Sequence, residues 1–200
     1  MGIMNLQLWF RYKKAQLYTR LVRSDFGSIG KGSWIVCPFL SFNPKGIYLG
    51  ENVGIFQNCW LDCIKEYAGT QYNARLEVGD RTSIGSDAHF IACNRISIGR
   101  DVVIAQRVYI TDNLHGYDDI NKGIMSQPLV HSGPVQIEDQ VWLGEGVCVM
   151  PNVTIGKHSI IGSNAVVTKS IPPYSVAVGI PAKVIRQYNH QTNCWERVTD

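Results

Sequence analysis

Large apolar residues return every six positions along most of the chain. In one phase of this period they are Leu49, Ile55, Leu61, Val78, Ile84, Phe90, Ile98, Ile104, Ile110, Ile137, Leu143, Val149, Ile155, Ile161 and Val167. Where the next unit follows without a break, the fourth residue after each is small or aliphatic, as at Val53, Ala88 and Val147. Helical spacing of three and four residues does not give this register, so the pattern predicts short β-strands.

A six-residue unit holds one short strand and a corner, which is too little to bury its own apolar residue. Three units that close a triangle solve this problem, and successive coils then stack as parallel strands about 4.8 Å apart. Glycine often follows the large residue, as at Gly50, Gly79 and Gly99, where the backbone bends or packs closely. The sequence therefore predicts an all-β fold, a three-sided parallel β-helix over residues 26–188. The period alone does not set the handedness.

Three breaks in the period mark places where the β-helix sends out loops. The longest covers residues 113–134, a shorter one runs from Ile64 to Ala74, and a two-residue slip lies between Phe90 and Ile98. Loops as long as the first are usually functional or disordered. It carries His115, and as an extended loop on a rigid prism it is well placed to reach a neighbouring subunit.

Residues 1–25 lie outside the period and are predicted to form an amphipathic helix. Leu6, Trp9, Phe10, Leu17 and Leu21 fall on one face at spacings of three or four, among basic residues and with no acidic residue before position 25. Two interpretations stay open. The helix caps the end of the prism and shields its strand edges, or it makes a peripheral contact in a membrane interface. Residues 189–200 are expected to be a C-terminal tail.

Composition narrows the class of protein. Two hundred residues with 45% hydrophobic composition suit one soluble domain, and no apolar run approaches the ~20 residues of a membrane span. The net charge is +3, with 19 basic and 16 acidic residues spread along the chain, so nucleic acid is not an expected partner. Six cysteines without a C-x-x-C pair, and no cleavable leader, favour a reducing cytoplasm.

Two motifs give a family resemblance over roughly residues 28–188. The apolar-Gly repeats with Trp142-Leu143-Gly144, and the closing residues 179–186 (GIPAKVIR), resemble the hexapeptide-repeat acyltransferase superfamily. Residues 112–117 (DNLHGY), in the long loop, are similar to its sugar and polysaccharide O-acetyltransferase branch, which includes maltose and galactoside acetyltransferases. The resemblance implies a left-handed β-helix and a homotrimer with active sites between subunits. It also implies acetyl-CoA as co-substrate with no required metal, and a saccharide acceptor from capsular polysaccharide or lipopolysaccharide synthesis.

The implied chemistry is acetyl transfer from a thioester to a hydroxyl group, which needs a base because an un-ionised alcohol is a poor nucleophile. Histidine suits this task, since an ordinary imidazole pKa of about 6.5 leaves a neutral nitrogen near pH 7. His115 occupies the catalytic position of the family motif. Acceptor binding is expected from Asp112, Asn94 and Asn113, with His89 as a further candidate. Asp112 has an alternative role, which is to orient His115.

Coenzyme A combines a narrow pantetheine arm with phosphates, so its site should pair a groove with cations. The resemblance assigns this site to Trp142, Gly144, Glu145, Ser163, Thr168, Lys169, Lys183 and Arg186. A backbone amide near Gly144 or Glu145 is the hypothetical donor to the oxyanion of the tetrahedral intermediate. Lys183 stands where some relatives carry arginine, which puts a bidentate phosphate contact there in doubt.

Other functions stay open as alternatives. N-acetylation of a nucleotide-linked amino sugar is the main one. A γ-type carbonic anhydrase needs three histidines around zinc, and the close histidine pair of such relatives is absent here. A non-catalytic scaffold is a further alternative, but it gives no function to the loop that carries His115 or to Lys183 and Arg186. The expected location is the cytoplasm, at the inner face of the membrane if residues 1–25 touch lipid.

Overall fold

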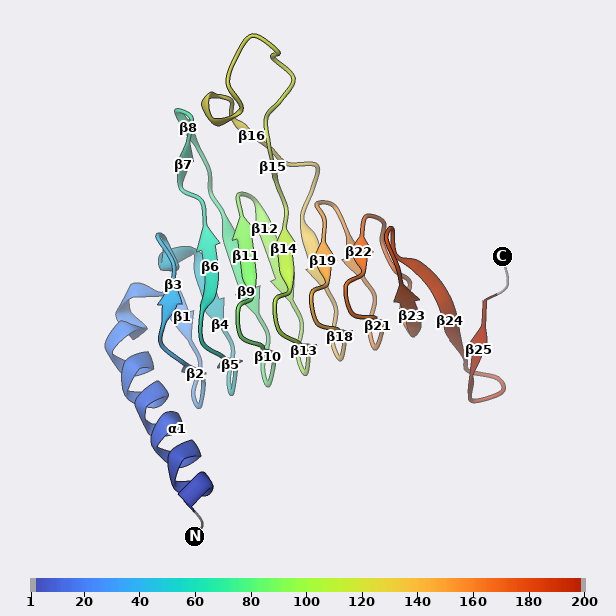
Figure 1. Cartoon of the computed structure of the whole chain (residues 1–200), viewed down its shortest axis with the longest axis horizontal. Helices are drawn as coiled ribbons and strands as arrows, with labels where there is room; N and C mark the ends of the chain where they lie inside the picture. Colours follow the sequence, from blue (N-terminus) through green and yellow to red (C-terminus); the bar gives the residue numbers. More distant parts are fainter. Residues whose placement is uncertain (1–2, 199–200) are drawn as a thin grey trace.

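The six-residue period folds into a three-sided prism of parallel strands (Figure 1). The computed structural model describes residues 3–198. Each coil gives one strand to each of three sheets in turn, so strands that are neighbours in a sheet come from successive coils. The described chain is therefore mostly β, with one long helix before the prism and one long arm projecting from it, as predicted.

The three sheets are built from short strands, one from each successive coil. The first sheet holds β1 (Ser28–Ile29), β4 (Ile47–Leu49), β9 (Arg75–Val78), β12 (Arg95–Ile98), β17 (Val135–Ile137) and β20 (Thr154–Ile155). The second begins with β2 (Trp34–Ile35), β5 (Gly54–Ile55), β10 (Ser83–Ile84), β13 (Val103–Ile104), β18 (Trp142–Leu143) and β21 (Ile160–Ile161). The third holds β3 (Phe39–Leu40), β6 (Cys59–Cys63), β11 (His89–Ala92), β14 (Tyr109–Thr111), β19 (Cys148–Val149) and β22 (Val166–Val167).

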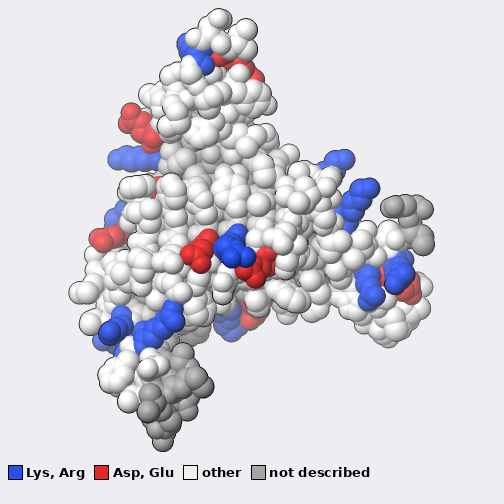
Figure 2. All heavy atoms as spheres, viewed as in Figure 1, with Lys and Arg blue, Asp and Glu red and all other residues white. Residues whose placement is uncertain are grey.

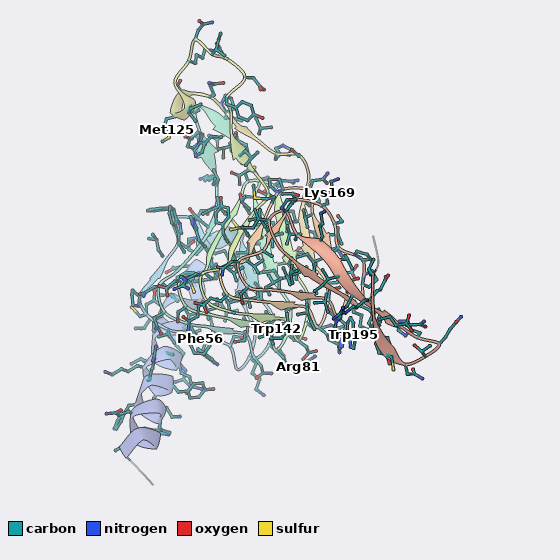
Figure 3. The ribbon with its side chains drawn as sticks, turned by 45° about the vertical axis from the view of Figure 1, so that its right-hand side comes forward. Phe56, Arg81, Met125, Trp142, Lys169 and Trp195 are labelled. Carbon is teal, nitrogen blue, oxygen red and sulfur yellow. The ribbon has the colours of Figure 1, made fainter. Side chains whose placement is uncertain are left out.

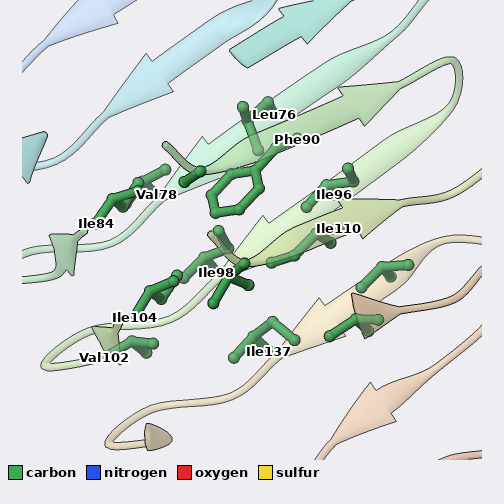
Figure 4. Packing of buried hydrophobic residues seen from close by; sticks show 14 of the residues in the cluster. Leu76, Val78, Ile84, Phe90, Ile96, Ile98, Val102, Ile104, Ile110 and Ile137 are labelled. Atoms are coloured by element: carbon green, nitrogen blue, oxygen red, sulfur yellow. The ribbon is translucent and has the colours of Figure 1, made fainter. Parts of the chain in front are cut away.

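The core is built from the positions that the period identified. Every large residue of that phase is buried, with at most 3% exposure. They stack in register along each sheet: Val78 pairs with Ile98, and Phe90 lies between Leu61 and Ile110. Figure 4 shows Val78, Phe90 and Ile98 among the side chains that point into one continuous interior. Burial of apolar surface between coils thus supplies what no single six-residue unit can.

The corners repeat as regularly as the core. The third residue after the large one adopts a positive φ in coil after coil, with 55° at Asn52, 56° at Arg81 and 57° at Asp101. Glycines lie beside these turns because stacked coils leave no room for a side chain. A Cβ on Gly79 would lie 2.6 Å from the carbonyl oxygen of Gly99 in the next coil. This confirms the predicted reason for the glycines.

The helix α1 (Ile3–Val22) covers the N-terminal end of the prism and is followed by the 3-10 turn η1 (Arg23–Asp25). Ala15 and Thr19 are each 2% exposed, and the Thr19 hydroxyl accepts a hydrogen bond from the Ile35 amide at 2.8 Å. The predicted capping role is therefore present. The apolar face that the sequence singled out is not the face that packs, because Leu17 and Leu21 are 59% and 71% exposed. No helix within residues 3–198 is long and apolar enough to cross a membrane.

The C-terminal end of the prism extends the second sheet. After β23 (Ser175–Val178), strands β24 (Lys183–Asn189) and β25 (Cys194–Arg197) add antiparallel partners. Residues 189–198, expected to be a tail, thus form the turn and second strand of a hairpin. The six-residue period could not predict this hairpin, because the period has ended by that point.

Two insertions leave the prism at the same corner, after strands of the third sheet (Figure 1). The shorter is the hairpin β7 (Glu66–Tyr67) and β8 (Thr70–Gln71). The longer is the arm of residues 113–134, with β15 (Leu114–His115), β16 (Leu129–Val130) and the 3-10 turn η3 (Ile124–Ser126). The third 3-10 turn, η2 (Pro44–Gly46), lies within the first coils. The arm is ordered in part by Gln127, whose amide nitrogen donates to the carbonyl oxygens of Asp119 and Lys122.

Candidate active site

His115 lies on the arm, where the hairpin β7–β8 contacts it. The antiparallel pair β15–β16 fixes the backbone of His115 opposite Leu129. Nδ1 of the ring lies 3.2 Å from the hydroxyl oxygen of Tyr67, and the two rings meet edge to face with centroids 5.4 Å apart. Tyr72 joins the same two insertions, since its hydroxyl accepts from the Leu129 amide at 2.8 Å. The ring is thus held from one side by the second insertion.

The Tyr67 hydroxyl also lies 3.2 Å from the sulfur of Met125. A phenol has one hydrogen to donate and lone pairs to accept with. One arrangement satisfies all three groups: the hydroxyl donates to the sulfur and accepts from Nδ1–H of His115. In that tautomer Nε2 carries the lone pair of the imidazole, and a hydrogen bond of this kind to the other nitrogen is what sets the tautomer of a histidine.

Asp112, Asn94 and Asn113 meet at the base of the arm. The two oxygens of the Asp112 carboxylate accept from the backbone amides of Cys93 and Asn94, at 2.8 and 2.9 Å. The side-chain amide of Asn113 donates to the same carboxylate at 3.0 Å and to the Ile91 carbonyl at 3.1 Å. Asp112 is fully buried. Its bonds therefore lie within the corner, which favours a structural role at the root of the arm.

The cysteine in this corner is not an activated nucleophile. Burial raises the pKa of the Cys93 thiol to about 12, and the neighbouring Asp112 carboxylate adds to this shift. Burial likewise raises the pKa of Cys63, one strand further along, to about 12. A thiol with such a pKa stays protonated near neutral pH and is a poor nucleophile.

His89 lies on the outer face of the third sheet, in a row of aromatic side chains. Its ring stacks on Trp60 with centroids 4.4 Å apart and meets the Tyr109 ring at 5.3 Å. Burial lowers its pKa, so the ring is neutral near pH 7. In the described part of the chain, Nε2 of His89 and Nε1 of Trp60 are both buried without a hydrogen-bond partner. Buried polar atoms of this kind call for a partner from outside the chain or from water.

Three of the eight residues assigned to the coenzyme, Trp142, Lys183 and Arg186, lie on strands of the second sheet. Trp142, Ile160, Val176 and Arg186 are register partners on four successive strands. Trp142 is 51% exposed at one end of this row, and Arg186 is exposed at the other. Four strands span about 14 Å, which suits an extended ligand with an apolar arm and anionic groups at one end. Lys183 is on the same strand as Arg186, which is β24, and it pairs with Val178 of β23.

The remaining assigned residues lie at the corners of the last coils. Ser163 follows β21, and Thr168 and Lys169 follow β22, all three exposed. The Gly144 amide donates to the Ile161 carbonyl at 2.8 Å as part of the sheet, so it is not free to bind an oxyanion. Of the two amides predicted for that role, the Glu145 amide is the remaining candidate. The Glu145 side chain pairs with Arg107 at 2.5 Å.

One chain does not bring all these residues together. Figure 3 shows Met125 on the projecting arm, with Trp142 on the prism well away from it. Three acceptor candidates, Asp112, Asn94 and Asn113, cluster at the root of the arm. His89 lies apart from them at the start of β11, and Trp142 and Arg186 lie on another sheet. Tyr67, Tyr72 and Met125 were missed by the sequence reasoning. The signal available for the two tyrosines was the shorter break from Ile64 to Ala74, because it leaves the prism at the same corner as the arm.

No group of three or more histidine, cysteine, aspartate or glutamate side chains that could hold a metal ion occurs within the described residues.

Comparison with known proteins agrees with the fold and with the repeat. Residues 134–169 match the family described as bacterial transferase hexapeptide (six repeats), and residues 75–112 match the hexapeptide repeat of succinyl-transferase. Galactoside O-acetyltransferase of Escherichia coli K12 is 28% identical over 84% of this chain and 68% of its own length. WbbJ of the same strain, described as a putative lipopolysaccharide biosynthesis O-acetyl transferase, is 39% identical over 59% of this chain. The chain spans 63% of the length of WbbJ.

Solved structures agree as well. The hexapeptide-repeat acetyltransferase VCA0836 of Vibrio cholerae, complexed with acetyl coenzyme A, is 26% identical with a TM-score of 0.61, over 84% of this chain and 74% of that one. The N-acyltransferase AntD of Bacillus cereus, at 20% identity, covers 88% of this chain and 90% of that one with a TM-score of 0.72, which shows the shared fold. The repeat, the prism and these likenesses support the hexapeptide-repeat acyltransferase superfamily for this chain, with its left-handed parallel β-helix fold.

Proposed function

We propose that this protein is an acetyl-CoA-dependent O-acetyltransferase that modifies a hydroxyl group of a saccharide, with His115 as general base. The observation that carries the proposal is the setting of that ring. It stands on a projecting arm, and Tyr67 contacts Nδ1 at 3.2 Å, which leaves the opposite nitrogen to face a substrate. The naming of WbbJ and of galactoside O-acetyltransferase supports an O-acetyltransferase of saccharides, including lipopolysaccharide units.

The chemistry follows from the tautomer. Nε2 of His115 accepts the proton of the acceptor hydroxyl while the hydroxyl oxygen attacks the carbonyl carbon of the thioester. The resulting tetrahedral intermediate carries a negative oxygen, for which the Glu145 amide is the proposed donor. When the intermediate collapses, the carbon–sulfur bond breaks, and the imidazolium returns its proton to the leaving thiolate. The base is then regenerated for the next cycle.

The coenzyme runs along the outer row of the second sheet in this proposal. Trp142 flanks the acyl and pantetheine end, while Lys183 and Arg186 bind the phosphates. Ser163, Thr168 and Lys169 border the arm of the coenzyme at the neighbouring corners. Asn94, Asn113 and His89 border the acceptor, and Asp112 fixes the corner from which the arm departs.

A homotrimer completes the site. Because Trp142 and the arm lie apart in one chain, the arm of one subunit has to meet the coenzyme row of another. The arm has the surface for such a contact, since Ile120, Ile124 and Met125 are 92%, 49% and 72% exposed. Apolar side chains gathered on one projection are typical of a protein interface. The reaction takes place in the cytoplasm in this proposal.

The experiment that tests the function measures release of the coenzyme thiol from acetyl-CoA with a panel of hydroxyl and amino sugars. We expect turnover with hydroxyl sugars, and mass spectrometry should find the acetyl group in an ester. Turnover with amino sugars alone would shift the reaction to N-acetylation, which is the alternative activity for this fold. No turnover with any sugar would overturn the proposal.

Tyr67→Phe tests the tautomer argument. Loss of the hydroxyl removes the hydrogen-bond partner of Nδ1 but leaves the aromatic contact, so kcat is expected to fall about two- to tenfold, the value of one hydrogen bond, with little change in either KM. Steady-state kinetics with both substrates check this. Tyr117→Phe is the matched control, since it removes a hydroxyl from a side chain on the arm that is 64% exposed. Equal effects of the two variants would contradict a role for Tyr67 in positioning the ring.

The double variant Lys183→Ala/Arg186→Ala tests the coenzyme row. Removal of two cations is expected to raise the KM for acetyl-CoA about tenfold, because charge-assisted hydrogen bonds to phosphate are lost, while the acceptor KM changes little. Lys157→Ala, an exposed cation on another sheet corner, serves as control. The assignment is wrong if the acceptor KM is the one that rises.

A further inference from the structure

The helix α1 has two apolar faces, of which the prism uses one. Ala15 and Thr19 face the first coil, and Tyr12 meets Trp34 edge to face with ring centroids 6.1 Å apart. With 3.6 residues per turn, Leu6, Phe10, Leu17 and Leu21 fall within about 60° of one another, on the side opposite Ala15 and Thr19. We call this row of four the outer stripe. Its members are 45%, 51%, 59% and 71% exposed.

Basic side chains flank the outer stripe. Lys13 and Arg20 lie along one side of it and Lys14 along the other, as the same angular spacing requires. Residues 3–22 contain no acidic side chain. Within the described residues, the ion pairs of the protein involve none of these three cations. Figure 2 shows basic side chains gathered at the lower left, where α1 meets the prism.

Two other basic residues of this region, Arg11 and Arg23, form hydrogen bonds with the prism. They are therefore not counted among the cations that flank the outer stripe. Arg11 donates to the side-chain oxygen of Gln57, and Arg23 donates to the Ile29 carbonyl at 2.5 Å. Trp9, 45% exposed, lies beside the stripe with Nζ of Lys13 at 5.8 Å from its ring centre. An exposed indole and lysines on either side of an apolar row are features that favour contact with a lipid–water interface.

We infer that the outer stripe of α1 docks on the surface of an anionic lipid bilayer. The apolar row enters the boundary between headgroups and acyl chains, while Lys13, Lys14 and Arg20 contact negative headgroups. A second copy of this helix is a poor occupant, because its cations would oppose cations with no acidic side chain between them. The opposite face of α1 stays on the prism, so the β-helix is carried along the membrane without unfolding of its cap. If the proposed function holds, such docking brings the site to lipid-linked saccharides.

The test is sedimentation of the full-length protein with vesicles of phosphatidylcholine alone, or of phosphatidylcholine and phosphatidylglycerol in equal amounts. We expect binding to the second kind, reduced by added salt. Leu17→Glu/Leu21→Glu and Lys13→Glu/Lys14→Glu are each expected to lower the partition coefficient about tenfold or more. Leu40→Glu/Phe42→Glu is the control for the leucine variant, because it places the same two charges on side chains that are 44% and 74% exposed elsewhere on the prism. It should bind as wild type does.

Three outcomes would overturn the inference: no binding to anionic vesicles, equal binding of the leucine variant and wild type, or a loss of self-association in that variant with no change in lipid binding. Thermal unfolding of each variant checks that the prism is intact. His115→Ala should bind vesicles as wild type does, so failure of the docking is distinguishable from failure of the proposed catalysis.

Discussion

His115→Ala is expected to lower kcat by about 10²–10⁴-fold, the usual contribution of a general base. The variant keeps the arm, since the backbone of His115 is paired with Leu129 and the arm is held further by Tyr72 and Gln127. What it loses is the nitrogen that takes the hydroxyl proton. The KM for acetyl-CoA should change little, because the imidazole is not assigned to coenzyme binding. Initial rates over a range of both substrates provide the measurement.

A second histidine on the arm supplies the control for this experiment. His131 is exposed and lies after β16. His131→Ala removes an imidazole from the same element, and we expect its kcat to stay close to wild type. If His115→Ala keeps more than a tenth of the wild-type kcat, or if both variants lose activity equally, then the ring is not the base.

Phe90→Ala is expected to destabilise the protein by about 3–5 kcal/mol, the range typical of large aromatic truncations in a core. Phe90 is fully buried and lies between Leu61 and Ile110 of the adjoining coils. Truncation leaves a cavity that rigid neighbouring coils cannot fill, because each is held by its own sheet hydrogen bonds. Urea unfolding at one fixed protein concentration measures the change, since subunit association also contributes to apparent stability.

The matched control is Phe42→Ala, the same truncation at a side chain that is 74% exposed and is assigned to neither the site nor the subunit contact. We expect a change within about 0.5 kcal/mol, as for most surface substitutions. A loss of less than about 1 kcal/mol for Phe90→Ala would mean that the coils relax into the space, and that the core is less tightly packed than its register suggests.

The six-residue period was enough to predict the prism and most of its core. The period is predictive because each interior coil packs between two similar coils. Every six-residue unit must therefore supply one large apolar residue to the core. The same reasoning fails at the ends, where no neighbouring coil exists. For α1, helical spacing identified the apolar face of Leu17 and Leu21 but not the face that packs on the prism. That face relies on the small Ala15 and the hydroxyl of Thr19 rather than on large apolar residues.

The sequence predicts His115 as the base from its loop and motif, and that role stays a prediction; the surroundings of the candidate residues were less predictable. The sequence suggests Asp112 as an acceptor ligand or a partner of His115, whereas its carboxylate accepts from the amides of Cys93 and Asn94. A carboxylate at the end of a strand can bind a ligand or accept hydrogen bonds from nearby backbone amides. The sequence pattern is the same in both cases. The contact of Tyr67 with His115 depends on two insertions whose roots are about 10 Å apart along the third sheet, a relation between coils that no local pattern contains.

The hydrogen bond from the Ile35 amide to the Thr19 hydroxyl also bears on how far the stack of coils can extend. A stack of coils has no natural limit, since each end offers the same backbone groups that the interior coils use to join one another. Molecules with bare ends would add to each other head to tail and grow into fibres. By covering the first coil with α1, and by turning the last one back through β24 and β25, the sequence makes a repeating architecture into a particle of fixed length.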